Sequence, residues 1–238
     1  MKTRIVFCRS NPIAPDPRVT KSARALSDAG FDVKLIGWQR SGESVNDDYV
    51  EGLRRQSLSI KAPYGRGLFN LWGLLRWQWG LLQWLYANRA DFDIIHACDF
   101  DTVLPAQICK WLFGKRVVYD IFDFYADHLR ATPNWIKSLI RAVDLKIINW
   151  VDALIIADDS RWEQIAGSNP LLSAVIYNTP VDQMQTTEVE LAPEQPEVLR
   201  VVYVGLMQIE RGLLDLISLL SNHPTWHLDL AGFGGDQE

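Results

Sequence analysis

The chain has 238 residues, of which 48% are hydrophobic and 22% are charged. This composition is typical of a globular protein and excludes fibrous, collagenous and disordered chains. The formal net charge of −5 argues against a nucleic-acid-binding protein, because polyphosphate binding requires a basic surface. Three cysteines without metal-ligand spacing indicate a reducing compartment and no metal site. The first apolar run is too short for a signal peptide, so we expect a cytoplasmic protein.

Apolar and amphipathic segments alternate along the chain. Continuous apolar runs predict strands at 2–8, 31–38, 53–60, 93–98, 116–121, 153–157, 174–177, 199–205 and 227–231. Helical periodicity predicts helices at 19–29, 67–88, 102–113, 135–150, 160–166 and 213–221. This order predicts an α/β protein with a doubly wound, mostly parallel Rossmann-like sheet, in which ligands bind at the carboxyl ends of the strands.

A polar stretch divides the chain into unequal parts. Residues 182–197 are rich in Gln, Thr, Pro and acids and lack an apolar period, which indicates a linker between domain 1–181 and segment 198–238. The second segment contains a single β-α-β unit, which buries too little surface for independent stability. We therefore expect the chain to be a fragment or to require a completing domain or subunit.

The loop after the first predicted strand contains the first candidate site. We expect Asp16 to N-cap the following helix, Pro17 to occupy its first position and Arg18 to project from its first turn. An arginine beside the free N–H groups of a helix N-terminus suits a phosphate or carboxylate. The alternative is that the prolines only stiffen the loop. Because the loop has no GxGxxG motif, a dinucleotide-binding function is disfavoured.

The segment DIIHACDFDTVLPA places polar residues at the end of another strand. Here we expect Asp101 to N-cap the next helix, which leaves Asp99 as the residue without a structural role and therefore the better functional candidate. His96 could bind substrate, but we favour a core histidine that hydrogen-bonds to the backbone.

The segment VVYDIFDFYADH follows the same pattern, with Asp120, Asp123 and Asp127 after a strand. One of these acids should cap a short helix, and the others should share the edge of the sheet with Asp99. Such a pocket would be acidic and would suit polyhydroxylated ligands such as sugars. The alternative is a solvated loop with ordinary helix caps.

Tryptophan and cationic residues are concentrated between the first and third predicted helices, in a stretch that includes the second. Residues 52–90 contain six Lys or Arg and no Asp or Glu. In the helix 67–88 we expect one face to pack on the sheet, formed by Leu71, Leu74, Leu75, Leu82 and Leu85. The outer side would present a strip with Arg76 and Gln83. Two pairs of tryptophans would flank this strip, Trp72 with Trp79 on one side and Trp77 with Trp84 on the other. Aromatic residues around a cationic strip are typical of a helix on an anionic membrane, so we expect residues 66–89 to contact the inner face of the membrane peripherally. The alternative is that these tryptophans pack against neighbouring helices or a missing half of the protein.

Six segments in series resemble glycosyltransferase family 4, whose GT-B fold has two Rossmann-like halves. They are DPRVTKSARALSDAGFDVKLI, DIIHACDFDTVLPA, RVVYDIFDFYAD, VDALIIADDS, VIYNTP and VVYVGLMQIERGLLDLI. The resemblance implies transfer of a sugar from a nucleotide-sugar donor, with retention of configuration and without a required metal or other cofactor. It also implies that the N-terminal half binds the acceptor, which we expect to be lipid-linked or an envelope polysaccharide.

The resemblance also assigns roles to individual residues. Gly205 matches a strand-end glycine of the family, and Arg211 and Gly212 match a Lys-Gly pair whose cation neutralises the donor diphosphate. Leu206 and Cys98 stand where many members have Arg and His, respectively.

From these matches we expect Asp99 and Asp123 to act as catalytic residues that orient the acceptor. Arg18, His96, Asp101 and Asp120 are the expected substrate-binding residues. Two functions remain open at this point: a glycosyltransferase, or a non-catalytic acceptor-binding module that derives from one. An oxidoreductase is disfavoured because the glycine fingerprint is missing.

Overall fold

The computed structural model describes residues 2–43, 47–62, 71–128, 132–179 and 199–233. The chain divides into two compact units, Met1–Pro180 and Val181–Glu238. The predicted linker at 182–197 lies outside the described residues, and so do the first four residues of the helix predicted at 67–88.

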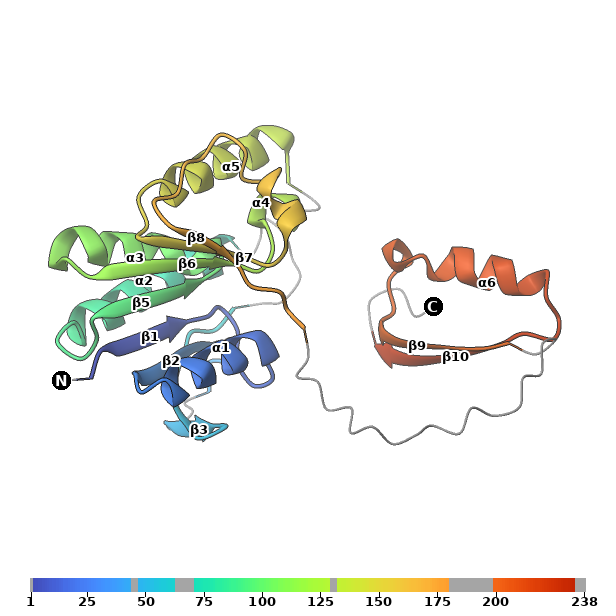
Figure 1. The fold of residues 1–238 in the computed structure, drawn as a ribbon, viewed down its shortest axis with the longest axis horizontal. Helices are drawn as coiled ribbons and strands as arrows, with labels where there is room; N and C mark the ends of the chain where they lie inside the picture. Colours follow the sequence, from blue (N-terminus) through green and yellow to red (C-terminus); the bar gives the residue numbers. More distant parts are fainter. Residues whose placement is uncertain (1, 44–46, 63–70, 129–131, 180–198, 234–238) are drawn as a thin grey trace. The chain divides into compact units, whose positions relative to one another are not determined.

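Unit 1 is built on an eight-stranded sheet with the strand order β3-β4-β2-β1-β5-β6-β7-β8 (Figure 1). Its strands are β1 (Arg4–Cys8), β2 (Asp32–Gln39), β3 (Asp48–Val50), β4 (Leu53–Ser59), β5 (Ile94–Cys98), β6 (Arg116–Ile121), β7 (Ala153–Ile156) and β8 (Ser173–Val175). Every pairing is parallel except that of the edge strand β3 with β4. The predicted mostly parallel α/β sheet is therefore confirmed. Strand β3 is short and was not predicted.

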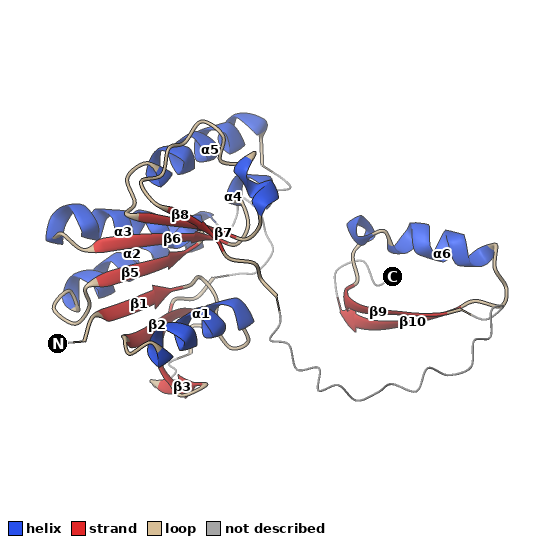
Figure 2. Ribbon diagram, viewed as in Figure 1, coloured by secondary structure: helices blue, strands red, loops and turns tan. Residues whose placement is uncertain are grey.

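Helices cover both faces of this sheet (Figure 2). They are α1 (Pro17–Asp28), α2 (Leu71–Ala87), α3 (Phe100–Phe113), α4 (Tyr125–His128) and α5 (Asn134–Ile148), with a 3₁₀ turn η2 (Asp159–Trp162) where a helix was predicted at 160–166. One core cluster lies between α1 and strands β1 and β2, and a larger one lies under α2, α3 and α5. None of the helices in the described ranges is both long enough and apolar enough to cross a lipid bilayer.

The packed face of α2 only partly matches the predicted one, since Leu85 is buried and Leu74 packs on the core as expected. Its buried residues are Gly73, Trp77, Leu81 and Leu85, whereas Leu71 and Leu75 are exposed. Trp77 stacks on Trp38 of β2 with ring centroids 5.1 Å apart. Because leucine and tryptophan occur all around this helix, the larger ring of Trp77 fills the space above the sheet, and Leu71 and Leu75 stay outside.

Unit 2 contains β9 (Arg200–Leu206), a 3₁₀ turn η3 (Ile209–Arg211), α6 (Leu213–Ser221) and β10 (His227–Phe233). The two strands pair in parallel over seven residues. Gly212 is left-handed, with φ of 75°, which lets the chain turn directly from η3 into α6. Gly232 pairs with Gly205, and a Cβ atom at Gly232 would lie 1.7 Å from the Gly205 carbonyl oxygen. The two glycines therefore allow the strand ends to approach.

Candidate functional site

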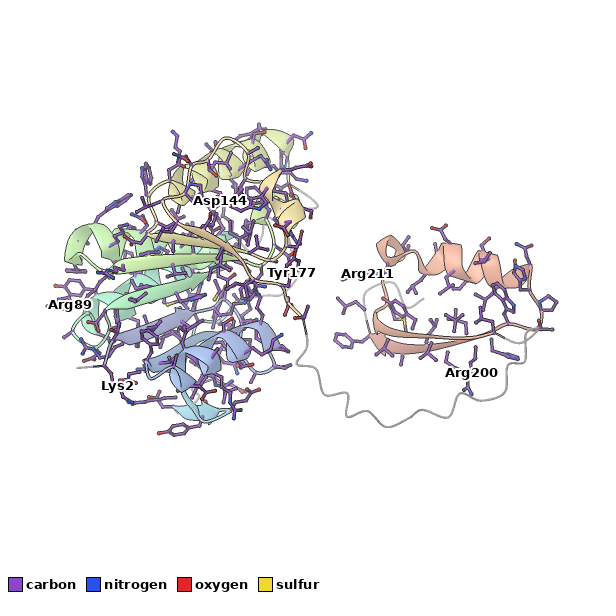
Figure 3. All side chains as sticks on the ribbon, viewed as in Figure 1. Lys2, Arg89, Asp144, Tyr177, Arg200 and Arg211 are labelled. Carbon is purple, nitrogen blue, oxygen red and sulfur yellow. The ribbon has the colours of Figure 1, made fainter. Side chains whose placement is uncertain are left out.

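The strand order reverses between β1 and β5, so the loops after these two strands diverge and leave a crevice at the carboxyl edge. A pocket of about 640 Å³ lies at this edge. We call it the rim pocket; it is lined by Arg9, Pro15, Asp16, Pro17, Arg18, Phe122, Asp123, Ala157, Asp158, Arg161, Tyr177, Asn178 and Thr179. Tyr177 marks this edge where the chain leaves β8 (Figure 3).

Arg9 and Asp99 join the two loops across the crevice. Arg9 follows β1, Asp99 follows β5, and their side chains form an ion pair. Arg9 Nε also donates to Asp16 Oδ2 at 3.0 Å. Asp16 caps α1 by accepting from the Val19 N–H at 3.3 Å, as the sequence predicts. One arginine thus connects both loops to the start of a helix.

Asp99 has a structural role that the sequence analysis did not assign to it. Its Oδ1 accepts from the backbone N–H groups of Phe122 and Asp123, at 2.8 and 3.4 Å, and so fixes the loop after β6. Burial raises the pKa of the Asp99 carboxyl, and the Arg9 guanidinium opposes this shift. Asp99 also has a positive φ of 66° with ψ of 168°, a strained conformation for a non-glycine residue that is found most often at functional sites.

The predicted cap of α3 is wrong by two residues. The helix begins at Phe100, so Asp99 occupies the N-cap position, where it makes no side-chain cap hydrogen bond. Asp101 lies within the first turn and is buried. Burial, together with the nearby Asp99 carboxylate, raises the pKa of Asp101 to about 6. Asp101 is not among the residues that line the rim pocket.

Arg18, Asp120 and His96 form a buried ionic cluster beneath the rim. Arg18 Nη2 lies 2.7 Å from Asp120 Oδ1, and its Nη1 donates to the Ile176 carbonyl at 2.8 Å. His96 Nε2 lies 3.2 Å from Asp120 Oδ2, so the histidine contacts a carboxylate and not the backbone as predicted. Arg18 and Asp120 are only 5% and 2% exposed. In this arrangement both terminal nitrogens of Arg18 are engaged within the protein, and Asp120 holds Arg18 in place.

Asp123 is a predicted carboxylate that remains accessible and lines the rim pocket, whereas Asp127 is exposed but does not line it. The Asp123 side chain is 55% exposed, and Oδ1 accepts from Arg161 Nη2 at 3.1 Å. Arg161 Nε lies 3.2 Å from Asp158 Oδ2. The rim pocket therefore presents an arginine between two carboxylates, and its lining contains as many arginines as aspartates. The predicted acidic pocket is in fact mixed in charge.

The sequence analysis missed several lining residues, among them Arg9, Asp158, Arg161 and Tyr177. Arg9, Asp158 and Tyr177 come one or two residues after strands β1, β7 and β8. The rule that ligands bind after parallel strands could have found these three. Arg161 lies in the 3₁₀ turn η2 and had no such signal.

The predicted donor-side residues all lie in unit 2. Gly205 is in β9, and its Cβ position would come 3.1 Å from the Tyr203 hydroxyl. Arg211 is exposed at the end of η3, and Gly212 occupies the N-cap of α6 without a side-chain cap (Figure 3). This uncapped N-terminus and the adjacent guanidinium are suited to an anion. In the described residues, no group of three or more His, Cys, Asp or Glu is arranged to bind a metal ion.

Comparisons with solved structures show which proteins share this fold. Sucrose-phosphate synthase from Thermosynechococcus elongatus has a TM-score of 0.70 at 14% identity, over 100% of this chain and 64% of that chain. A trehalose-6-phosphate protein from E. coli bound with UDP-2-fluoro glucose has a TM-score of 0.66 at 16% identity, over 98% and 65%. The lipopolysaccharide outer core galactosyltransferase WaaB has a TM-score of 0.63 at 17% identity, over 98% and 62%. The chain thus spans less than two thirds of each of these proteins.

Sequence comparison identifies the family. No curated protein sequence matches the chain. The family model for the glycosyl transferase 4-like domain matches residues 15–167, which include β2 to β7 and the arginines and aspartates of the rim other than Arg9. The fold, of GT-B type, agrees with this match. The chain belongs to the family of glycosyl transferase 4-like domains.

Proposed function

We propose that the protein transfers a sugar from a nucleotide-sugar donor to a hydroxylated acceptor, with retention of configuration, and that the rim pocket binds the acceptor. The observation that carries this proposal is the accessible Asp123–Arg161–Asp158 arrangement at the carboxyl edge of the sheet. Exposed carboxylates accept hydrogen bonds from sugar hydroxyls, and a guanidinium donates to hydroxyl or phosphate oxygens.

Asp99 and Arg9 are positioning residues in this proposal. Asp99 holds the N–H groups of Phe122 and Asp123, and Arg9 holds Asp99. The orientation of the Asp123 carboxylate therefore depends on an ionic network beneath it, which keeps the loop in place when the acceptor binds.

In unit 2, we propose that the donor diphosphate binds at Arg211 and the N-terminus of α6. The leaving nucleoside diphosphate gains negative charge in the transition state, and a fixed guanidinium beside backbone N–H groups stabilises that charge. The proposal is supported by two solved structures of the same fold that contain UDP with glucose and UDP-2-fluoro glucose. As the acceptor, we propose a lipid-linked glycan or an envelope polysaccharide.

The test is release of nucleoside diphosphate from UDP-, GDP- and ADP-hexoses by the full chain, with glycan acceptors supplied as a panel. We expect release from one donor class that increases with one acceptor. Asp123→Asn should reduce acceptor-dependent turnover by about tenfold to a hundredfold, because it weakens one or two hydrogen bonds to a charged group. Asp28→Asn, an exposed change at the end of α1, is the control. Acceptor binding without turnover would instead favour a non-catalytic acceptor-binding module.

A further inference from the structure

Helix α2 has an exposed apolar stripe on the side opposite the sheet. Its buried face is formed by Gly73, Trp77, Leu81 and Leu85. Trp72 is 71% exposed and Trp79 is 62% exposed. We call the exposed side the outer stripe; it consists of Leu71, Trp72, Leu75, Arg76, Trp79, Gln83 and Tyr86. Residues 72, 79 and 86 are seven apart and therefore lie along one side of the helix.

The charge on this stripe has one sign. Arg76 is the only charged residue of α2, which contains no acid. Arg89, just beyond the helix, lies 4.7 Å from the centre of the Tyr86 ring and extends the cationic surface at this end of α2 (Figure 3). Because large exposed apolar patches mark interaction sites, a partner for the stripe should be apolar at its centre and anionic around it.

A groove of about 480 Å³ lies beside the outer stripe, between α2 and the end of β4. Its lining includes Arg76, Trp79 and Gln83 of α2 and the segment 57–60 at the end of β4. Gly80 allows this close packing, since a Cβ atom there would lie 2.6 Å from Cδ1 of Ile60. The groove therefore presents the side-chain donors of Arg76 and Gln83 next to the exposed Trp79. A guanidinium and an amide N–H group are both suited to donate to phosphate oxygens.

We propose that the outer stripe docks α2 parallel to the surface of an anionic lipid bilayer. Trp72 and Trp79 enter the boundary between headgroups and acyl chains, and Arg76 with the adjoining groove binds a lipid phosphate. Tryptophan rings have an apolar body and a polar N–H, which suits this boundary. Attraction between the cations and anionic lipid supplies the remainder of the affinity. The stripe and groove share no residue with the rim pocket, so this inference is independent of the proposed transfer reaction.

The test is flotation of the full chain with phosphatidylcholine vesicles, with and without phosphatidylglycerol. We expect binding only to the vesicles that contain phosphatidylglycerol, and loss of binding at about 0.5 M salt, where screening is strong. Trp72→Ser and Trp79→Ser should each weaken binding by about tenfold. Arg76→Gln should weaken it by about fivefold, whereas Arg76→Lys should retain it.

The matched control is Trp135→Ser, because Trp135 on α5 is as exposed as Trp72, at 70%. This variant should bind vesicles as the unchanged protein does, and all variants should keep the same melting temperature. Three results would overturn the proposal: no vesicle binding, equal binding to vesicles without anionic lipid, or an equal loss in Trp135→Ser. It would also be overturned if sedimentation showed that Trp72→Ser converts a dimer to a monomer, because a second copy of the chain would then cover the stripe.

Discussion

Asp120 and Asp123 lie three residues apart and each is paired with an arginine. The structure predicts a large loss of stability when Asp120 is removed and a small one when Asp123 is removed. Asp120 is 2% exposed and its partner Arg18 is 5% exposed, with 2.7 Å between Arg18 Nη2 and Asp120 Oδ1. Asp120→Ala leaves the guanidinium buried without its counter-charge, which costs about 3–5 kcal/mol of unfolding free energy. For a unit of this size, that loss lowers the melting temperature by roughly 6–20 °C.

Asp123→Ala is the matched comparison. Because its side chain is 55% exposed, removing this ion pair should cost less than about 1 kcal/mol. Urea unfolding followed by far-UV circular dichroism measures both variants, with the denaturant slope as a check that the folded and unfolded states are unchanged. A double variant, Arg18→Met with Asp120→Leu, should recover most of the lost stability, since it removes both buried charges. The reasoning is refuted if Asp120→Ala and Asp123→Ala cost the same.

Three further predictions concern stability. Trp77→Ala should cost about 3–5 kcal/mol of unfolding free energy because the ring is fully buried, whereas Trp72→Ala should change it by no more than about 0.5 kcal/mol. Urea unfolding measures both losses, and equal losses would contradict the observed packing of α2. Burial raises the pKa of Asp144 to about 7 from its ordinary 3.8, so the folded protein retains a proton that the unfolded chain releases. Stability should therefore fall as pH rises from about 4 to 7, and Asp144→Asn should flatten that dependence; an unchanged pH profile in the variant would contradict this cause. Gly232→Ala places a Cβ atom against the Gly205 carbonyl. Amide hydrogen exchange should therefore become faster in β9 and β10 but not in β1. Unchanged exchange in unit 2 would contradict the close approach of Gly232 to Gly205.

Much of the fold was predictable because parallel strands buried on both faces are continuous apolar runs, and loops between them contain recognisable caps. Asp16 and Pro17 at the start of α1 are an example. The edge strand β3 was missed because it is three residues long and pairs antiparallel at the periphery, so it carries neither an apolar run nor a period.

The roles of the individual carboxylates were harder to predict because they depend on partners distant in sequence. Asp99 pairs with Arg9, 90 residues away, and Asp120 pairs with Arg18, 102 residues away. The start of α3 lies two residues before the predicted one, so Asp99 occupies the N-cap and Asp101 lies in the first turn of the helix. The prediction of the packed face of α2 was only partly right for another reason. Apolar residues surround this helix, so periodicity alone does not select the buried side.

The central claim is that this family member uses a nucleotide sugar, and the most direct measurement is calorimetric titration of the full chain with UDP, GDP and ADP. We expect saturable binding of one of these nucleotides, weakened about tenfold to a hundredfold in Arg211→Ala by loss of a charged hydrogen bond to phosphate. Asp123→Asn should bind the nucleotide as the unchanged protein does, because it alters only the acceptor pocket. Absence of binding to all three nucleotides, or binding unaffected by Arg211→Ala, would contradict the proposed donor site.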